Sequence, residues 1–324
     1  MRIVGRPLHP LLARELNERL RTRRVAMVII AYLTVLVVVL LVVYLVLLSE
    51  LAHPHAASYP VAALLYSALL GRSVFETLLL SMVLLVAFIV PGLTAGALTS
   101  EGERETLVSP ALMVAPRSIL FCKLISSLCF VSLLVVAALP LLGVSFVLGG
   151  VGIGELARGV VGVLATGAVL ACMALACSSF ARKTRTAMVL AYGVAVFLIF
   201  VTSFLSAALA EIADAPESSP ELFTLNPLFA VADVTARAEP IDTTEFFLPL
   251  ESLRQYIYGT PSASELDGYI DAVSPPALRQ SAPDSERRVR FWVASLGVLG
   301  GLGGAALVLA SERLRVHSLS VRPT

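Results

Sequence analysis

Six apolar stretches alternate with polar segments along the chain, and each is long enough to cross a lipid bilayer as a helix. A membrane-spanning helix needs about 20 mostly apolar residues. Pro140 lies inside the third stretch and predicts a tilt or a kink there, and Pro91-Gly92 predicts a break near the end of the second. The pattern therefore predicts an all-α, polytopic integral membrane protein with about six transmembrane helices. The stretches are 25–48, 74–98, 119–148, 157–179, 187–209 and 291–310.

A basic leader, residues 1–24, precedes the first apolar stretch. Leucines recur at every fourth position among arginines and glutamates, at residues 8, 12, 16 and 20. This spacing is typical of an amphipathic helix that lies in the headgroup layer before the chain turns into the first span. The alternative is a solvated basic anchor that only fixes the topology. The charged residues that we assign to the interfacial helix are Arg14, Glu15, Glu18 and Arg19.

Basic residues near the span ends predict the orientation, because short cytoplasmic loops carry an excess of Lys and Arg. The leader, the loop at 180–186 and the C-terminal tail are basic, and with six spans they fall on one side together with loop 99–118. We therefore expect a multi-pass protein of the cell (inner) membrane with both termini in the cytoplasm. The first apolar stretch exceeds the roughly 7–15 residues of a signal-peptide core, so we expect the mature protein to keep it.

The opposite side of the membrane receives 49–73, a short turn near 149–156 and the long segment 210–290. The long segment holds 14 acidic and 6 basic residues, a net charge of −8. It could cap a substrate exit, bind an extracytoplasmic partner or only connect two spans. The expected divisions of the chain are the leader at 1–24, five spans with loop 99–118 at 25–209, the acidic segment at 210–290, and the sixth span with its tail at 291–324.

The composition excludes several classes of function. The chain is 57% hydrophobic and 15% charged with a net charge of +1, so no overall field attracts nucleic acid. It contains no Gly-Lys-Ser/Thr phosphate loop, no His-Glu-x-x-His and no Gly-x-Ser-x-Gly, so we expect no enzymatic activity and no cofactor in this chain. His53 and His55 lack a carboxylate or thiolate partner and indicate a solvated turn rather than a metal site. The cysteines, which are expected to be small buried apolar groups, are Cys122, Cys129, Cys172 and Cys177.

Two glycine-rich stretches are interpreted as packing features. The run at 149–154 is expected to form a turn between spans. The stretch at 297–306 lies inside the sixth apolar run, where small residues four apart allow close contact between helices. The predicted helix-packing glycines are Gly297, Gly300, Gly301 and Gly304.

The predicted spans carry almost no ionisable side chains. Glu76 and Arg158 lie near predicted outer ends, where they are expected to reach the interface. Ion-coupled transporters and proton pumps place acids or histidines at mid-membrane to bind the driving ion. No predicted span has one, which disfavours a secondary transporter and indicates that a cytoplasmic partner supplies the energy.

The stretch between the second and third spans is the candidate docking surface for that partner. Four charges fall within five residues, and Pro110 and Pro116 limit any helix that forms there. The alternative is a solvated loop that only marks the cytoplasmic side. The clustered charges are Glu101, Glu103, Arg104 and Glu105.

This stretch resembles the cytoplasmic loop of ABC-2 type transporter permeases, in which an acidic Glu-Arg-x-Thr-Leu segment precedes a proline-containing turn and an apolar run with an early lysine. The leader, residues 178–192, residues 224–234 and the basic exit from the last span are similar to other segments of that family, in the same order. The residues that match the loop are Glu103, Arg104, Thr106, Leu107, Pro116 and Lys123.

The resemblance implies a transmembrane subunit of an ABC transporter, usually an exporter. It implies a homo- or heteromeric dimer in the lipid membrane with two cytoplasmic ATPase subunits, which bind the ATP and Mg. Closure of the ATPases would push on loop 101–118 and on the leader helix. The alternative is a membrane scaffold or complex subunit that works through segment 210–290 without transport. The implied coupling residues are Glu101, Glu103, Arg104, Glu105, Thr106 and Leu107.

Overall fold

The computed structural model describes residues 23–51, 60–96, 99, 116–205, 208, 223–235, 248–250, 252–253 and 284–320. All regular secondary structure in these residues is helical. The elements are α2 (Arg23–Leu51), α3 (Pro60–Thr94), α6 (Pro116–Val147), α7 (Ile153–Phe180), α8 (Thr184–Val196), the π-helix η2 (Phe197–Val201), α11 (Pro227–Val234) and α14 (Asp284–Ser320).

Six helical segments are long and apolar enough to cross a membrane, which confirms the predicted helical fold with the character of a multi-pass membrane protein. The fifth combines α8 with η2. The second begins at Ser67 and not at residue 74, because α3 already starts at Pro60. Its earlier start brings Arg72 into the apolar segment. The six segments are Val25–Val46, Ser67–Thr94, Ser118–Val147, Ile153–Phe180, Thr184–Leu205 and Val293–Arg313.

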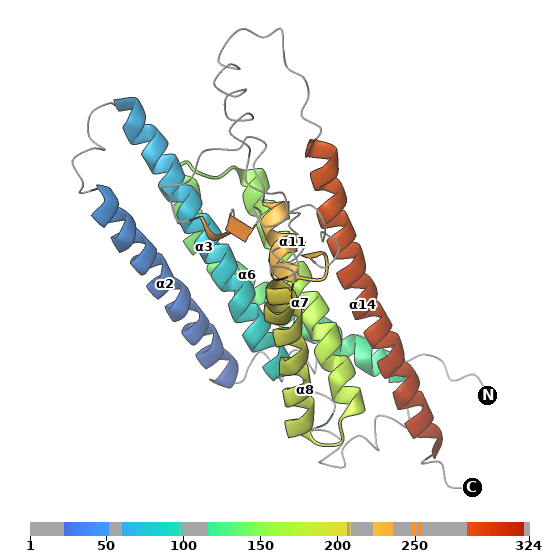
Figure 1. Cartoon of the computed structure of the whole chain (residues 1–324). Helices are drawn as coiled ribbons and strands as arrows, with labels where there is room; N and C mark the ends of the chain where they lie inside the picture. The colour runs from blue at the N-terminus through green and yellow to red at the C-terminus, as the bar shows by residue number, and fades with distance from the viewer. Residues whose placement is uncertain are drawn as a thin grey trace.

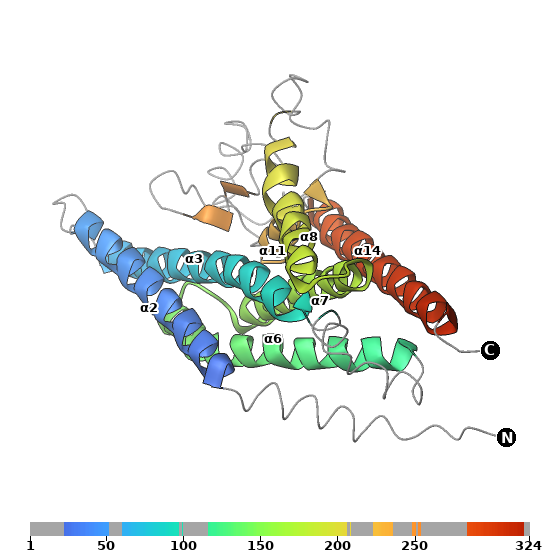
Figure 2. The same cartoon turned by 90° about the horizontal axis from the view of Figure 1, so that it is seen from below.

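Helix α7 lies at the centre of the bundle. It packs against α3, α6, α8 and α14, while α2 stands at one edge against α3 and α6 and α14 stands at the opposite edge (Figures 1 and 2). The main core is built from α3, α6 and α7. Helices α2, α8 and α14 expose many large apolar side chains. Such surfaces suit contact with lipid tails, which are as apolar as leucine.

Glycines allow the neighbours of α7 to approach its backbone. A Cβ atom added at Gly159 would lie 2.7 Å from Leu79 Cδ1 of α3. At Gly162, the missing side chain makes room for Val231 of α11, whose Cγ2 would lie 3.1 Å from an added Cβ. Close packing of this kind stabilises helix contacts in membranes, where the hydrophobic effect contributes little between helices.

Two prolines lie inside helices without ending them. Helix α6 runs through Pro140 to Val147, and α3 runs through Pro91 to Thr94. The predicted break at Pro91-Gly92 falls slightly later, at the turn residue Ala95.

Helix α8 contacts the turn of α3 that precedes Pro91. The Tyr192 hydroxyl donates to the Phe88 carbonyl at 3.0 Å. The two aromatic rings also pack with their centroids 5.6 Å apart. Gly92 permits this contact, because a Cβ there would lie 2.6 Å from the Tyr192 hydroxyl oxygen.

The predicted glycine turn is present between α6 and α7, at residues 148–152. Gly149 has a φ of +86°, a left-handed conformation that side chains other than glycine rarely adopt. The turn packs against α3, since a Cβ at Gly71 would lie 2.8 Å from the Ser145 carbonyl oxygen and 2.9 Å from the Gly150 nitrogen. This end of the bundle is called the upper end, following Figure 1, and the end with the α7–α8 connection is the lower end.

The described part of segment 210–290 is built into the bundle. Helix α11 packs against α7, α14 and η2, and Figure 2 shows it among these helices. Seven of its eight residues, Pro227 to Asp233, are buried. Phe229 of α11 packs edge-on against Phe223, beside the buried Phe291 of α14. This helix is therefore a structural part of the upper half of the bundle.

Candidate functional site

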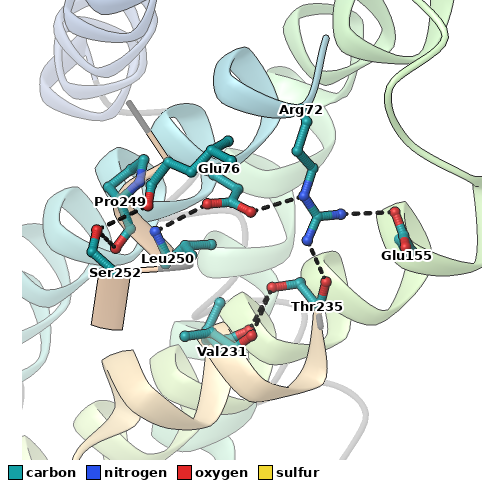
Figure 3. A network of polar contacts seen from close by, with 10 residues as sticks. Arg72, Glu76, Glu155, Val231, Thr235, Pro249, Leu250 and Ser252 are labelled. Atoms are coloured by element: carbon teal, nitrogen blue, oxygen red, sulfur yellow. Dashed lines mark hydrogen bonds and ion pairs between the residues drawn. The ribbon is translucent and has the colours of Figure 1, made fainter. Parts of the chain in front are cut away.

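A buried cluster of charged side chains lies at the upper end of the bundle (Figure 3). The guanidinium of Arg72 donates from Nε to Glu76 Oε1 and from Nη1 to Glu155 Oε2, each at 2.8 Å. Its Nη2 donates to the carbonyl oxygen of Thr235 at 2.7 Å. One side chain of α3 thereby joins the first turn of α7 and the C-terminal end of α11.

Glu76 extends this cluster to a fourth segment. Its second carboxylate oxygen, Oε2, accepts a hydrogen bond of 3.1 Å from the backbone N–H of Leu250. The Ser252 hydroxyl donates to the Leu248 carbonyl at 2.9 Å, which closes a short turn around Leu250. The cluster therefore fastens the described residues 248–250 and 252–253, as well as α11, to the side of α3.

The cluster is shielded from solvent. The side chains of Arg72 and Glu76 are 2% and 0% exposed, and that of Glu155 is 17% exposed. Two carboxylates share one guanidinium, so the formal charge of the three groups is −1. Removing one partner of a buried ion pair typically destabilises a protein by about 3–5 kcal/mol, because the other charge stays buried without compensation. The arrangement of these segments is therefore strongly coupled to Arg72.

The prediction that Glu76 reaches the membrane interface is wrong. Arg72 precedes it by four residues, so both side chains lie on one face of α3, and that face turns into the bundle. Arg158, by contrast, is exposed as predicted and donates from Nε to the carbonyl of Gly154 at 3.3 Å. The i, i+4 spacing of opposite charges in an apolar stretch was the signal for an internal pair, but the predicted span began after Arg72.

Two helix ends add favourable electrostatics to the cluster. Glu155 lies in the first turn of α7, where exposed backbone N–H groups favour a negative charge. Thr235 caps the C-terminal end of α11, where the partial negative charge favours the Arg72 cation. Each such contact typically contributes about 0.3–1 kcal/mol.

The other end of α11 is held by Asn226. Its Oδ1 accepts from the Leu228 N–H at 2.9 Å and caps the helix, which begins with Pro227 in the first position. Its Nδ2 donates to the Ile199 carbonyl in η2 at 3.0 Å and to the Ser203 hydroxyl oxygen at 2.6 Å. The Asn-Pro pair seen in the sequence thus starts α11 and ties it to the fifth span.

Most of the predicted site residues lie outside the described residues. These are Glu101, Glu103, Arg104, Glu105, Thr106 and Leu107 of the docking loop, Arg14, Glu15, Glu18 and Arg19 of the leader, and His53 and His55.

The remaining predicted site residues are on α14 and α6. Among the residues that the structure describes, nothing lies within 4 Å of a Cβ added at Gly297, Gly300, Gly301 or Gly304, whereas Gly303 contacts Cys172 of α7. The four predicted glycines are exposed, so their role in packing against another helix stays a prediction. Lys123 lies eight residues into α6 and is buried.

No group of three or more His, Cys, Asp or Glu side chains within the described ranges could hold a metal ion. The four cysteines are thiols; Cys122 is buried, as predicted, and the others are half-buried. In comparisons with known proteins, no family model and no curated protein matches this chain.

Proposed function

We propose that this chain is the membrane-spanning permease subunit of an ABC-2 type transporter, an exporter whose ATP is hydrolysed by separate cytoplasmic subunits. The proposal combines two observations. Loop 99–118, the leader and residues 224–234 resemble segments of that family, and the six spans carry few charged residues. It does not depend on any catalytic group in the chain.

The position of charged residues in the spans is the observation that carries the proposal. At the upper end they are Arg72, Glu76, Glu155 and Arg158; at the lower end they are Lys123, Arg185, Glu312 and Arg313. Glu76 lies farthest from a span end, as the tenth residue of the segment that begins at Ser67, and it is engaged by Arg72. A protein driven by an ion gradient needs a group deep in the membrane that binds the ion. Energy supplied by a separate subunit therefore fits this chain better than an ion gradient does.

The lower end of the bundle fits a cytoplasmic orientation. Arg182, Lys183 and Arg185 are exposed around the α7–α8 connection. Arg313 of α14 lies near them and stacks over the Phe180 ring at 4.5 Å. Positive charge on short loops is typical of the cytoplasmic side, so we place the lower end and both termini there, in the cell (inner) membrane.

The coupling residues are assigned by the resemblance. In this proposal the loop that contains Glu101–Leu107 and the leader with Arg14–Arg19 contact two ATPase subunits, which bind ATP and Mg. A second copy of the chain, or a related permease, completes the membrane part. The loop connects to α6 at Pro116, so a push on it would be carried into the bundle by α6, which packs on the central α7.

Retention of an ATPase by the charged loop tests the proposal. We expect an ATPase subunit to co-purify with the chain, and Glu101→Lys with Glu105→Lys to weaken that retention while membrane levels stay normal. Ordinary surface substitutions change stability by about ±0.5 kcal/mol, whereas a like-charge contact in a docked interface costs several kcal/mol. The matched control, Glu265→Lys with Asp267→Lys, reverses two acids of the 210–290 segment and should leave retention unchanged. Equal retention in wild type and the Glu101/Glu105 variant would contradict a coupling role.

A further inference from the structure

Four exposed basic side chains gather at the lower end of the bundle, beside the ends of three spans. Arg182 and Lys183 lie in the α7–α8 connection, and Arg185 lies in the first turn of α8. Arg313 is the last residue of the sixth apolar segment. It joins the others because its guanidinium lies 4.5 Å from the ring centroid of Phe180, the last residue of α7. We call these four side chains the basic patch.

The basic patch carries positive charge that nothing described nearby neutralises. In the part of the chain that the structure describes, none of its four side chains forms an ion pair. Glu312 is the acidic side chain described beside them, so four positive charges and one negative charge leave a formal net charge of +3. Arg72 at the upper end differs, because two carboxylates and a carbonyl oxygen engage it. The lower end therefore presents cations that can bind an anion from outside the chain.

Exposed apolar side chains lie one helical turn above two of these cations. On α14, Leu309 precedes Arg313 by four residues, so both lie on one face of the helix. On α8, Val189 follows Arg185 by four residues in the same way. Leu309 is 59% exposed and Val189 is 71% exposed. Each helix thus presents a cation at its lower end and an apolar surface above it, which is the order of phosphate and acyl chains in a phospholipid.

The ring of Phe180 fixes the position of one cation of the patch. The face of an aromatic ring attracts a guanidinium, and this ring holds the Arg313 guanidinium at the junction of α7 and α14. The contact uses no hydrogen-bond acceptor, so the N–H donors of Arg313 stay available. A guanidinium presents these donors in a planar fork that matches phosphate oxygens.

We propose that the basic patch binds the headgroup of an anionic phospholipid, with the phosphate between Arg313 and the α7–α8 connection and the acyl chains along the exposed faces of α8 and α14. A lipid fits better than a soluble acidic partner, because the patch lies at the ends of three membrane-length segments, which is the depth of the headgroups. The inference requires that the chain spans a membrane. It does not rest on transport or on an ATPase.

Native mass spectrometry of the purified chain in detergent measures the affinity of added lipids. We expect phosphatidylglycerol to bind several-fold more tightly than phosphatidylcholine, which has no net charge, and added salt to weaken this preference. Arg185→Gln with Arg313→Gln should lower the affinity for phosphatidylglycerol several-fold and leave the affinity for phosphatidylcholine and the Tm unchanged. Unchanged affinity for phosphatidylglycerol in this variant would overturn the site.

Arg158→Gln is the matched control, because it removes an exposed arginine from the upper end of the bundle. It should bind phosphatidylglycerol like the wild type, and an equal loss there would show a general attraction of arginines to anionic lipid instead of a site. Phe180→Leu keeps every charge of the patch and removes the ring. We expect it to lower the affinity for phosphatidylglycerol by less than the double variant does, and an unchanged affinity would overturn the placing of Arg313 by the ring.

Two further measurements distinguish a lipid from the other anions that could bind. Glycerol 3-phosphate carries the phosphate without acyl chains, and we expect millimolar amounts to leave bound phosphatidylglycerol in place. Its displacement would assign the patch to a soluble phosphate compound. We also expect the Arg185/Arg313 variant to retain a co-purified ATPase as the wild type does, whereas loss of the ATPase with unchanged lipid binding would assign the patch to a partner protein. If no ATPase co-purifies with the wild type, the proposed function fails by itself, and the lipid measurements still decide this inference.

Discussion

Helices α7 and α14 are both glycine-rich and both long enough to span a membrane, yet their glycines have opposite surroundings. On α7, Gly159, Gly162 and Gly167 are buried and face α3, α11 and α6. On α14, Gly303 contacts α7, while four other glycines have no neighbour within 4 Å in the described part of the chain. Glycine spacing therefore indicates where a close contact is possible, and the position of the helix in the bundle decides whether this chain makes it.

The largest loss of stability is expected when a side chain is added at the most crowded glycine of α7. A Cβ on Gly167 would lie 2.6 Å from Val131 Cγ1, and a β-branched side chain has little freedom to move away. We expect Gly167→Ala to lower the free energy of unfolding by about 1–2 kcal/mol, since overpacking costs roughly 1–3 kcal/mol and helix propensity returns part of it. Thermal unfolding of the purified chain in detergent measures this. An unchanged Tm would show that α6 and α7 are not tightly packed.

An intermediate effect on stability is expected from a substitution where α14 contacts α7. A Cβ on Gly303 would lie 3.3 Å from Cys172 Cβ, so the neighbour needs to move by only a few tenths of an ångström. The small clash and the gain in helix propensity nearly cancel, and we expect Gly303→Ala to change stability by about 0.5 kcal/mol or less. The same unfolding assay applies. A loss as large as that of Gly167→Ala would place α14 much closer to α7 than the structure does.

The smallest effect on the single chain is expected at the exposed glycines of α14. Gly301→Ala meets no neighbour among the described residues and should leave stability unchanged or raise it by about 0.5–1 kcal/mol through helix propensity. Gly301→Leu sharpens the comparison, because it should spare the fold of one chain but weaken any close contact with a helix of a second chain. Size-exclusion chromatography with light scattering separates these outcomes. A destabilised monomer would mean that this face packs within one chain.

The six spans and the turn at 148–152 follow directly from the sequence, because membrane-length apolar runs and glycine turns are local patterns. The start of the second span could not be predicted correctly from these local patterns. Arg72 interrupts the apolar run at its upper end, so the predicted span begins at residue 74 although α3 begins at Pro60. A charged pair that is satisfied inside the protein does not end a membrane helix, and hydropathy alone does not register the pairing.

Little of the candidate site could be predicted from the sequence. Residues 224–234 are marked in the sequence only by resemblance, and no helix is predicted there, although Asn before Pro is a pattern typical of a helix start. The contact of Asn226 with Ile199 depends on a π-helix within the fifth span, whose apolar sequence does not differ visibly from an α-helix. Both α11 and its partner in the fifth span therefore came from the structure.

What the sequence determined by itself is a chain of membrane-length apolar helices with few charged side chains, because apolar run length and residue type are properties of neighbouring residues. Only the tertiary structure decided that α11 and residues 248–250 are fastened to α3. The bonds that do so join residues 163 and 174 positions apart, and the Arg72–Glu155 bond joins residues 83 apart. Contacts across such separations depend on which helices become neighbours in the bundle, and a buried arginine finds its partners only after those helices have packed.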